Sequence, residues 1–132
     1  MHVNTDSEVP IYLQVAEQIE SAILSGAFPE ETQVPSTTEI SVAYQINPAT
    51  VLKGMTQLVG VGLLYKKRGI GMFVAREAQK MVLEKRKKNF YDDYIIKLLD
   101  EAEKLRISRA ELIDMISGGE NHGRDNDVFD RN

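Results

Sequence analysis

The sequence predicts a mainly α-helical protein with one small β-hairpin. Two short helical segments, 37–45 and 48–60, are joined only through "QIN". A run of strand-forming residues that contains two glycines follows at 63–75. Residues 77–105 then contain neither Pro nor Gly, which favours a helix well above average length. These three observations place a compact helical unit with a hairpin ahead of a second, purely helical part.

A helical repeat of apolar residues defines the first element. Ile11, Val15, Ile19 and Ile23 recur every four residues and form one stripe, so we expect a helix over 10–25. The following "AFPEETQVP" has two prolines and no period, which indicates an ordered connection without helix.

Start signals mark the next two helices. Ser36 and Glu39 have the spacing of a capping box, in which the hydroxyl and the carboxylate each accept a backbone N–H of the first turn. Asn47 is a good N-cap, and Pro48 suits the first turn because its missing N–H has no partner there. Two short helices joined in this way predict a helix-turn-helix.

The stretch "LLYKKRGIGMFV" predicts a hairpin with strands 63–67 and 70–75 around Arg68-Gly69. The chain has a net charge of −4 and a pI near 5.2. Between residues 9 and 75 there are only four cations, and three of them are Lys66, Lys67 and Arg68. After a helix-turn-helix, such a hairpin is typical of a wing whose cations meet phosphates. A solvated hairpin is the alternative, and a winged helix-turn-helix over 9–75 is the fold we expect.

The remaining chain predicts a short helical domain over 76–117. Ser108 and Glu111 form a second capping box before a last helix. So small a part cannot bury its apolar stripes alone, so we expect a homodimer through these helices. A ligand cavity lined by the aromatic cluster of Phe90, Tyr91 and Tyr94 is the alternative. The expected interface residues are Tyr91, Tyr94, Ile95, Leu98, Leu99, Ala102, Leu105, Leu112 and Ile116.

Composition excludes several classes of function. The chain has no cysteine, so thiol chemistry and cysteine metal sites are absent. The N-terminus lacks a signal peptide and no apolar run could span a bilayer, which predicts a cytoplasmic protein without membrane contact. His2 and His122 lie in the ends 1–8 and 118–132, which we expect to be flexible and disordered respectively. We therefore expect no enzymatic activity, no bound metal and no cofactor. We interpret the basic run 84–88 as a solvated helix face.

Residues 9–75 resemble the N-terminal winged helix of GntR-type bacterial transcription regulators. The resemblance rests on "PIYLQV", the "VPS" that opens the second helix, the helix start "NPATV" and the hairpin "YKKRGIGMFV". The short helical C-terminus resembles the YtrA-like branch of the family, whose small second domain serves dimerisation. Members of that branch typically repress operons that encode ABC-type transporters. The resemblance implies a repressor that binds double-stranded DNA, at a roughly palindromic operator, as a homodimer.

The chain departs from the family pattern where base-reading arginines are usual. Thr38, Pro48 and Leu52 stand in those places, so arginine cannot read guanine from them. An interaction module that co-regulates with a partner protein, and barely reads DNA, is therefore the alternative function. The sequence names no operator, regulated gene or small-molecule effector. The DNA-contacting residues that the resemblance implies are Ser36, Thr37, Thr38, Asn47, Ala49, Thr50, Lys53, Lys66, Lys67, Arg68, Gly69 and Gly71.

Overall fold

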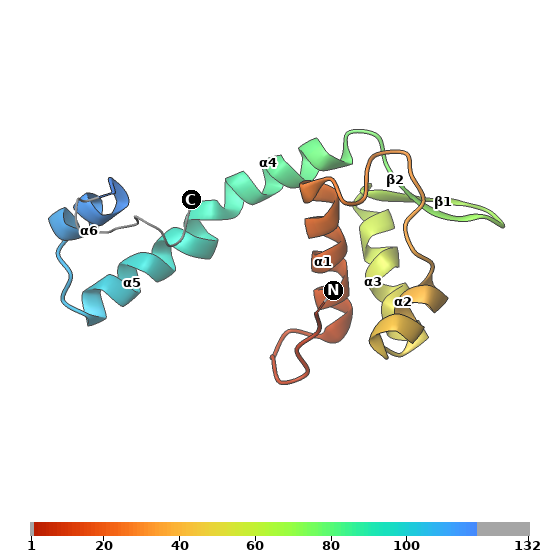
Figure 1. Ribbon diagram of the computed structural model, residues 1–132, viewed down its shortest axis with the longest axis horizontal. Coiled ribbons are helices and arrows are strands. Elements are labelled where there is room, and N and C mark those ends of the chain that lie inside the picture. The colour runs from red at the N-terminus through yellow and green to blue at the C-terminus, as the bar shows by residue number, and fades with distance from the viewer. Residues whose placement is uncertain (1, 119–132) are drawn as a thin grey trace. The chain divides into compact units, whose positions relative to one another are not determined.

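The computed structural model describes residues 2–118, which form two compact units (Figure 1). The first unit ends at Lys87 and the second begins at Lys88. Apart from Gly118, the tail that we expected to be disordered lies outside the described residues. Within 2–118, no helix is long and apolar enough to cross a bilayer.

The first unit contains the elements that the sequence predicts, and the ends of its first three helices and its two strands differ from the expected ones by at most one residue. The fold class, a winged helix-turn-helix followed by helices, is thereby confirmed. The elements are α1 (Ile11–Ser25), α2 (Thr37–Tyr44), α3 (Pro48–Gly60), β1 (Leu64–Lys67), β2 (Gly71–Val74) and α4 (Ala78–Phe90). The long helix expected over 77–105 is α-helical only to Phe90 in its first part, and this part continues past Lys87 into the second unit.

The core of this unit lies between α1 and α3, which run side by side (Figure 1). The stripe of α1 is buried as expected, with Val15 and Ile19 fully covered. The two helices approach closely at Gly54, where an added Cβ would come within 2.6 Å of the Tyr12 carbonyl oxygen. Any larger residue at Gly54 would push α3 away from α1, so the closeness of the crossing depends on this glycine.

The turn between α2 and α3 is held by side chains as well as by backbone. Gln45 has a positive φ of 53°, and the following Ile46 is buried. The Ser41 hydroxyl donates a hydrogen bond of 2.6 Å to the Ile46 carbonyl. Both capping boxes, at residues 36–39 and 108–111, form as the sequence predicts.

The hairpin gains a third extended segment that the sequence did not predict. Strands β1 and β2 are antiparallel, with Leu64 opposite Val74 and Lys67 opposite Gly71. On the other edge of β2, the Val34 N–H donates to the Met72 carbonyl at 3.0 Å. The loop before α2 thereby fixes one edge of the hairpin.

Two interactions attach the ends of this unit to α1. The buried Gln14 amide donates to the Asn4 carbonyl at 2.9 Å, which holds the segment before α1 in place. Glu20 accepts hydrogen bonds from Lys85 at 2.8 Å and from Arg86 at 3.4 Å. The run 84–88 is mostly exposed, as expected of a solvated helix face, but the sequence did not predict that Lys85 and Arg86 pair with Glu20.

The second unit contains a π-helical turn, η1 (Tyr91–Ile95), and the helices α5 (Ile96–Lys104) and α6 (Arg109–Ile116). Helical structure continues through Asn89, so the helix does not break there. From Tyr91 to Ile95, however, it is a π-helix and not an α-helix. A π turn adds a residue to one turn, and this shifts the faces that side chains occupy beyond it.

Candidate nucleic-acid interface

The tip of the hairpin carries three exposed cations. Lys66 and Lys67 end β1, and Arg68 begins the turn. The Ile70 N–H donates to the Lys67 carbonyl at 2.9 Å and closes this turn, in which Gly69 has a φ of 77°. A positive φ at this place favours glycine. The sequence therefore placed these side chains correctly at the tip of a wing.

The loop before α2 supports that tip. The Gln33 amide donates to the Ile70 carbonyl at 3.0 Å. Gly71 has a φ of 148°, and an added Cβ there would overlap the Gln33 amide nitrogen. Gly71 thus makes room for the amide that supports the turn. Sequence reasoning missed Gln33, because nothing near residue 33 signals a contact with residue 70.

Aromatic rings line one face of the wing. The Tyr65 and Phe73 rings are cross-strand partners and stack with centroids 5.8 Å apart. The Lys67 ammonium lies 4.3 Å from the centroid of the Phe73 ring. A cation in this position is attracted by the ring's negative face, which limits where the Lys67 side chain extends.

A carboxylate ties the same face to the loop. The Tyr65 hydroxyl donates to Glu31 at 2.6 Å, and the Arg76 guanidinium lies 3.4 Å from the other Glu31 oxygen. The hydrogen bond from Tyr65 lowers the pKa of Glu31 below its ordinary value of 4.5, and the charge of Arg76 lowers it further. The pKa of Tyr65 is raised because its hydroxyl donates a hydrogen bond to the Glu31 carboxylate, which favours the protonated form. These contacts hold β1 and the 28–35 loop together at neutral pH.

Three candidate residues at the start of α2 have different roles. The Ser36 hydroxyl accepts the Glu39 N–H at 3.0 Å, so it caps the helix. The Thr37 hydroxyl is half-buried and donates to the Met55 sulfur at 3.6 Å. Thr38 is exposed. Thr38 is therefore the side chain of this set that is most open to a partner.

The start of α3 presents small residues. The Asn47 side-chain oxygen accepts the Ala49 N–H at 2.8 Å and caps the helix. Ala49 is exposed and Thr50 is half-buried. The Lys53 ammonium lies 4.1 Å from the centroid of the Tyr12 ring on α1. The contact between Lys53 and Tyr12 joins helices distant in sequence, and sequence reasoning did not predict it.

The fold therefore carries all of the expected DNA-contacting residues on one compact unit. In Figure 1 the hairpin, α2 and α3 lie on the same side of α1. The helix dipoles of α2 and α3 add partial positive charge at the starts of these helices to that of the wing. At the start of α3, Pro48 has no N–H, and the N–H groups of Ala49 and Thr50 are bonded to Asn47. The arrangement offers donors and cations to a polyanion.

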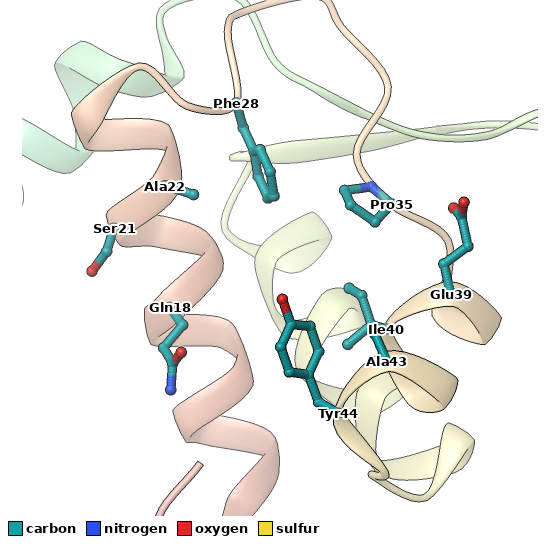
Figure 2. A pocket seen from close by; sticks show the side chains of 9 residues that line it. All are labelled: Gln18, Ser21, Ala22, Phe28, Pro35, Glu39, Ile40, Ala43 and Tyr44. Atoms are coloured by element: carbon teal, nitrogen blue, oxygen red, sulfur yellow. The ribbon is translucent and has the colours of Figure 1, made fainter. Parts of the chain in front are cut away.

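A separate cavity of about 490 Å³ lies between α1, the 28–35 loop and α2 (Figure 2). The Phe28 and Tyr44 rings point toward one another across it. Of its polar groups, the Glu39 carboxylate accepts the Ser36 N–H, and the Ser21 hydroxyl accepts a hydrogen bond from Arg86. The cavity includes neither the candidate DNA-contacting residues nor the aromatic cluster at 90–94.

Seven of the nine expected interface residues in the second unit remain at least partly exposed, and Ala102 and Leu112 are buried. Tyr94, Leu105 and Ile116 are exposed by 64%, 62% and 69%. Among the described residues of this unit, Ala102 and Leu112 are the only buried apolar side chains. The unit thus has almost no core of its own.

Three helices, a short turn between the second and third, and a basic hairpin define a winged helix-turn-helix protein. A family model described as bacterial regulatory proteins, gntR family, matches residues 11–74. The chain belongs to the GntR family, as its sequence motifs predicted.

Curated relatives of the chain include repressors. It is 33% identical over 84 residues to the HTH-type transcriptional repressor NagR of Bacillus subtilis, a match that spans 64% of this chain and 35% of NagR. The HTH-type transcriptional repressor YtrA of Bacillus subtilis is 27% identical over 84 residues, which span 64% of this chain and 65% of YtrA. The chain thus spans about a third of the length of NagR.

Solved structures of the family have the same fold. A GntR-family protein from Bacteroides thetaiotaomicron matches with a TM-score of 0.64 at 34% identity, over 82% of this chain and 94% of that one. The DNA-binding domain of AraR in complex with operator ORE1 matches with a TM-score of 0.51 at 32% identity. That match covers 56% of this chain and 90% of the AraR domain.

Proposed function

We propose that this protein is a transcriptional repressor that binds a roughly palindromic DNA operator as a homodimer. The observation that carries the proposal is the placement of Lys66, Lys67 and Arg68 at the tip of a supported wing. The AraR domain, which is similar to the first unit, has been solved on its operator. The resemblance to the YtrA-like branch, whose members typically repress operons that encode ABC-type transporters, is the ground for a transporter operon as the regulated target.

In this proposal each element of the first unit contacts a different part of the DNA. The beginning of α3 enters the major groove, where Ala49 and Thr50 allow the backbone to come close. The N–H groups at the start of α2 donate to phosphates, as free helix N-termini do, and the dipole of α3 attracts phosphates to its own start. The wing tip, Arg68-Gly69, reaches into the minor groove, and Lys66 and Lys67 neutralise phosphates beside it.

The composition of the second unit supports a homodimer. Exposed apolar side chains on η1, α5 and α6 outnumber the two buried ones, so the unit lacks a core that would stabilise it alone. A second copy supplies matching apolar residues through a two-fold axis. Two winged helices related by that axis require two half-sites, which is why the operator is roughly palindromic.

Fluorescence anisotropy tests the proposal. The protein is titrated onto duplex DNA from its own upstream region and onto a scrambled duplex, over a series of salt concentrations. We expect tighter binding to the upstream duplex, since the acidic chain has few cations for sequence-independent binding. Equal binding to both duplexes at every salt concentration would contradict the proposal and favour a protein-interaction module.

Two variants locate the site. Arg68→Ala should weaken binding and lower the slope of log K against log salt by about 1 for each wing that contacts a phosphate. Thr50→Ala should weaken binding with little change in that slope. Lys80→Ala removes an exposed cation of α4 that lies outside the proposed site, and it serves as the matched control. Normal binding by both Arg68→Ala and Thr50→Ala would show that the site lies elsewhere.

A further inference from the structure

The outward face of α3 carries one large exposed apolar side chain among polar ones, at a place where a DNA-reading helix makes specific contacts. Val51, Met55 and Leu58 point into the core and are almost fully covered. The opposite face carries Ala49 and, one turn on, Leu52, which is 46% exposed. These two residues line one shallow surface hollow, whose other lining residues are Lys53, Thr56, Gln57, Gly60 and Val61.

Side chains that usually read guanine or adenine are few on this face, and those present already contact other groups of the protein. Lys53 is the one cation in α2 and α3, and its ammonium lies over the Tyr12 ring at 4.1 Å. Asn47 uses its side-chain oxygen to cap α3, so a bidentate contact to adenine, which needs the same oxygen, would compete with the cap. Bidentate contacts to purines from the first turns of α3 would compete with these interactions, whereas the exposed Leu52 side chain is free to contact an apolar group.

In the major groove, thymine is the base that offers an apolar group. Its C5 methyl projects from the edge of the pair, and small apolar side chains contact it. We propose that Leu52, together with Ala49, reads thymine methyl groups, so that each half-site carries thymine where it faces α3. This inference rests on the proposed function, since it assigns the specificity of the same DNA site.

Deoxyuridine tests this directly, because it pairs like thymidine and lacks only the methyl group. Operator sites are first selected from random duplexes with the full chain. Each thymine of a selected site is then replaced by deoxyuridine, one position at a time in both half-sites, and affinity is measured by anisotropy. Removing one buried methyl should weaken binding about fourfold for each half-site at the position that faces Leu52.

Variants of the protein connect that effect to Leu52. Leu52→Ala should bind the thymine and deoxyuridine duplexes equally at that position, whereas Leu52→Met should keep most of the preference. Leu83→Ala is the matched control, because Leu83 on α4 is 45% exposed, almost as much as Leu52. The control should keep the full preference, and circular dichroism melts of all three variants verify that they fold.

The outcomes are distinct. Selection that succeeds with no position sensitive to deoxyuridine would overturn the inference and leave the proposed function standing. A preference for thymine that persists in Leu52→Ala would overturn the role of Leu52. Selection that enriches no sequence would overturn the proposed function and this inference together.

Discussion

Glu20 of α1 accepts a hydrogen bond from Lys85 of α4 at 2.8 Å, although the Glu20 side chain is only 8% exposed. Arg86 reaches the other carboxylate oxygen at 3.4 Å. A buried carboxylate requires such partners, because burial without them is strongly unfavourable. Lys85 and Arg86 therefore hold α4 to the winged helix.

Removing the charge of Glu20 should destabilise the first unit. Glu20→Gln keeps the shape but loses two charge-assisted hydrogen bonds, so we expect a loss of about 1–3 kcal/mol in the free energy of unfolding. Urea unfolding followed by circular dichroism measures it. Glu17→Gln, one turn earlier on an exposed position, should change stability by less than about 0.5 kcal/mol. Equal effects of the two substitutions would contradict a specific role for Glu20.

The wing should not tolerate a side chain at Gly71. Gly71→Ala combines an unfavourable φ of 148° with a clash against the Gln33 amide, so we expect a loss of about 1–3 kcal/mol. Gly60→Ala is the control, because no atom lies within 4 Å of its added Cβ. In the last turn of α3, alanine should be neutral or stabilising by up to about 1 kcal/mol. Thermal melts that rank the two variants the other way would show that Gln33 moves aside easily.

The contact between Tyr65 and Glu31 should depend on pH. A carboxyl whose folded-state pKa lies below its ordinary value of 4.5 stabilises the fold above that pH, and this contribution is lost as pH falls through the folded pKa. The Tyr65→Phe variant should therefore melt below the wild type at pH 7, and the difference should shrink below pH 4.5.

Melting curves from pH 7 to pH 3 measure this difference. Tyr44→Phe removes an exposed hydroxyl from another part of the unit, and its effect should not vary over the same range. A Tyr65→Phe difference that stays constant as pH falls would mean that the Glu31 hydrogen bond does not stabilise the wing.

A charge at Leu105, which follows the last residue of α5, should separate the proposed dimer. Leu105 is 62% exposed in the single chain, and Leu105→Glu would bury two carboxylates in a two-fold interface. We expect the mass in sedimentation equilibrium to fall from twice 14.9 kDa to 14.9 kDa. Val42→Glu, on an exposed residue of α2, should leave the mass unchanged. A wild-type chain that sediments as a monomer would contradict the dimer itself.

The helices and strands of the first unit were predictable because their signals are local. The Ser36 and Glu39 side chains cap a helix from within four residues, and Asn47-Pro48 starts the next one in the same way. The apolar stripe of α1 shows which face is buried. The place of three cations at a hairpin tip follows from the turn at Arg68-Gly69. Each of these features depends on neighbours in the sequence.

Contacts between distant residues were not predictable. Gln33 meets Ile70 across 37 positions, and Glu20 meets Lys85 across 65. Lys53 lies over Tyr12 because α1 and α3 pack closely at Gly54. The π turn at 91–95 also went unseen, since its residues suit an ordinary helix equally well.

By itself, the sequence determined the order of the elements, the winged helix-turn-helix and the family, because capping, periodicity and turn chemistry act over a few residues. The tertiary structure decided which charges are left for a partner. Lys85 and Arg86 are bound to Glu20, and Lys53 lies over a ring, whereas Arg68 is exposed at the wing tip. A charge is neutralised by the groups that folding brings within a few ångströms of it, and neither composition nor spacing along the chain specifies those groups.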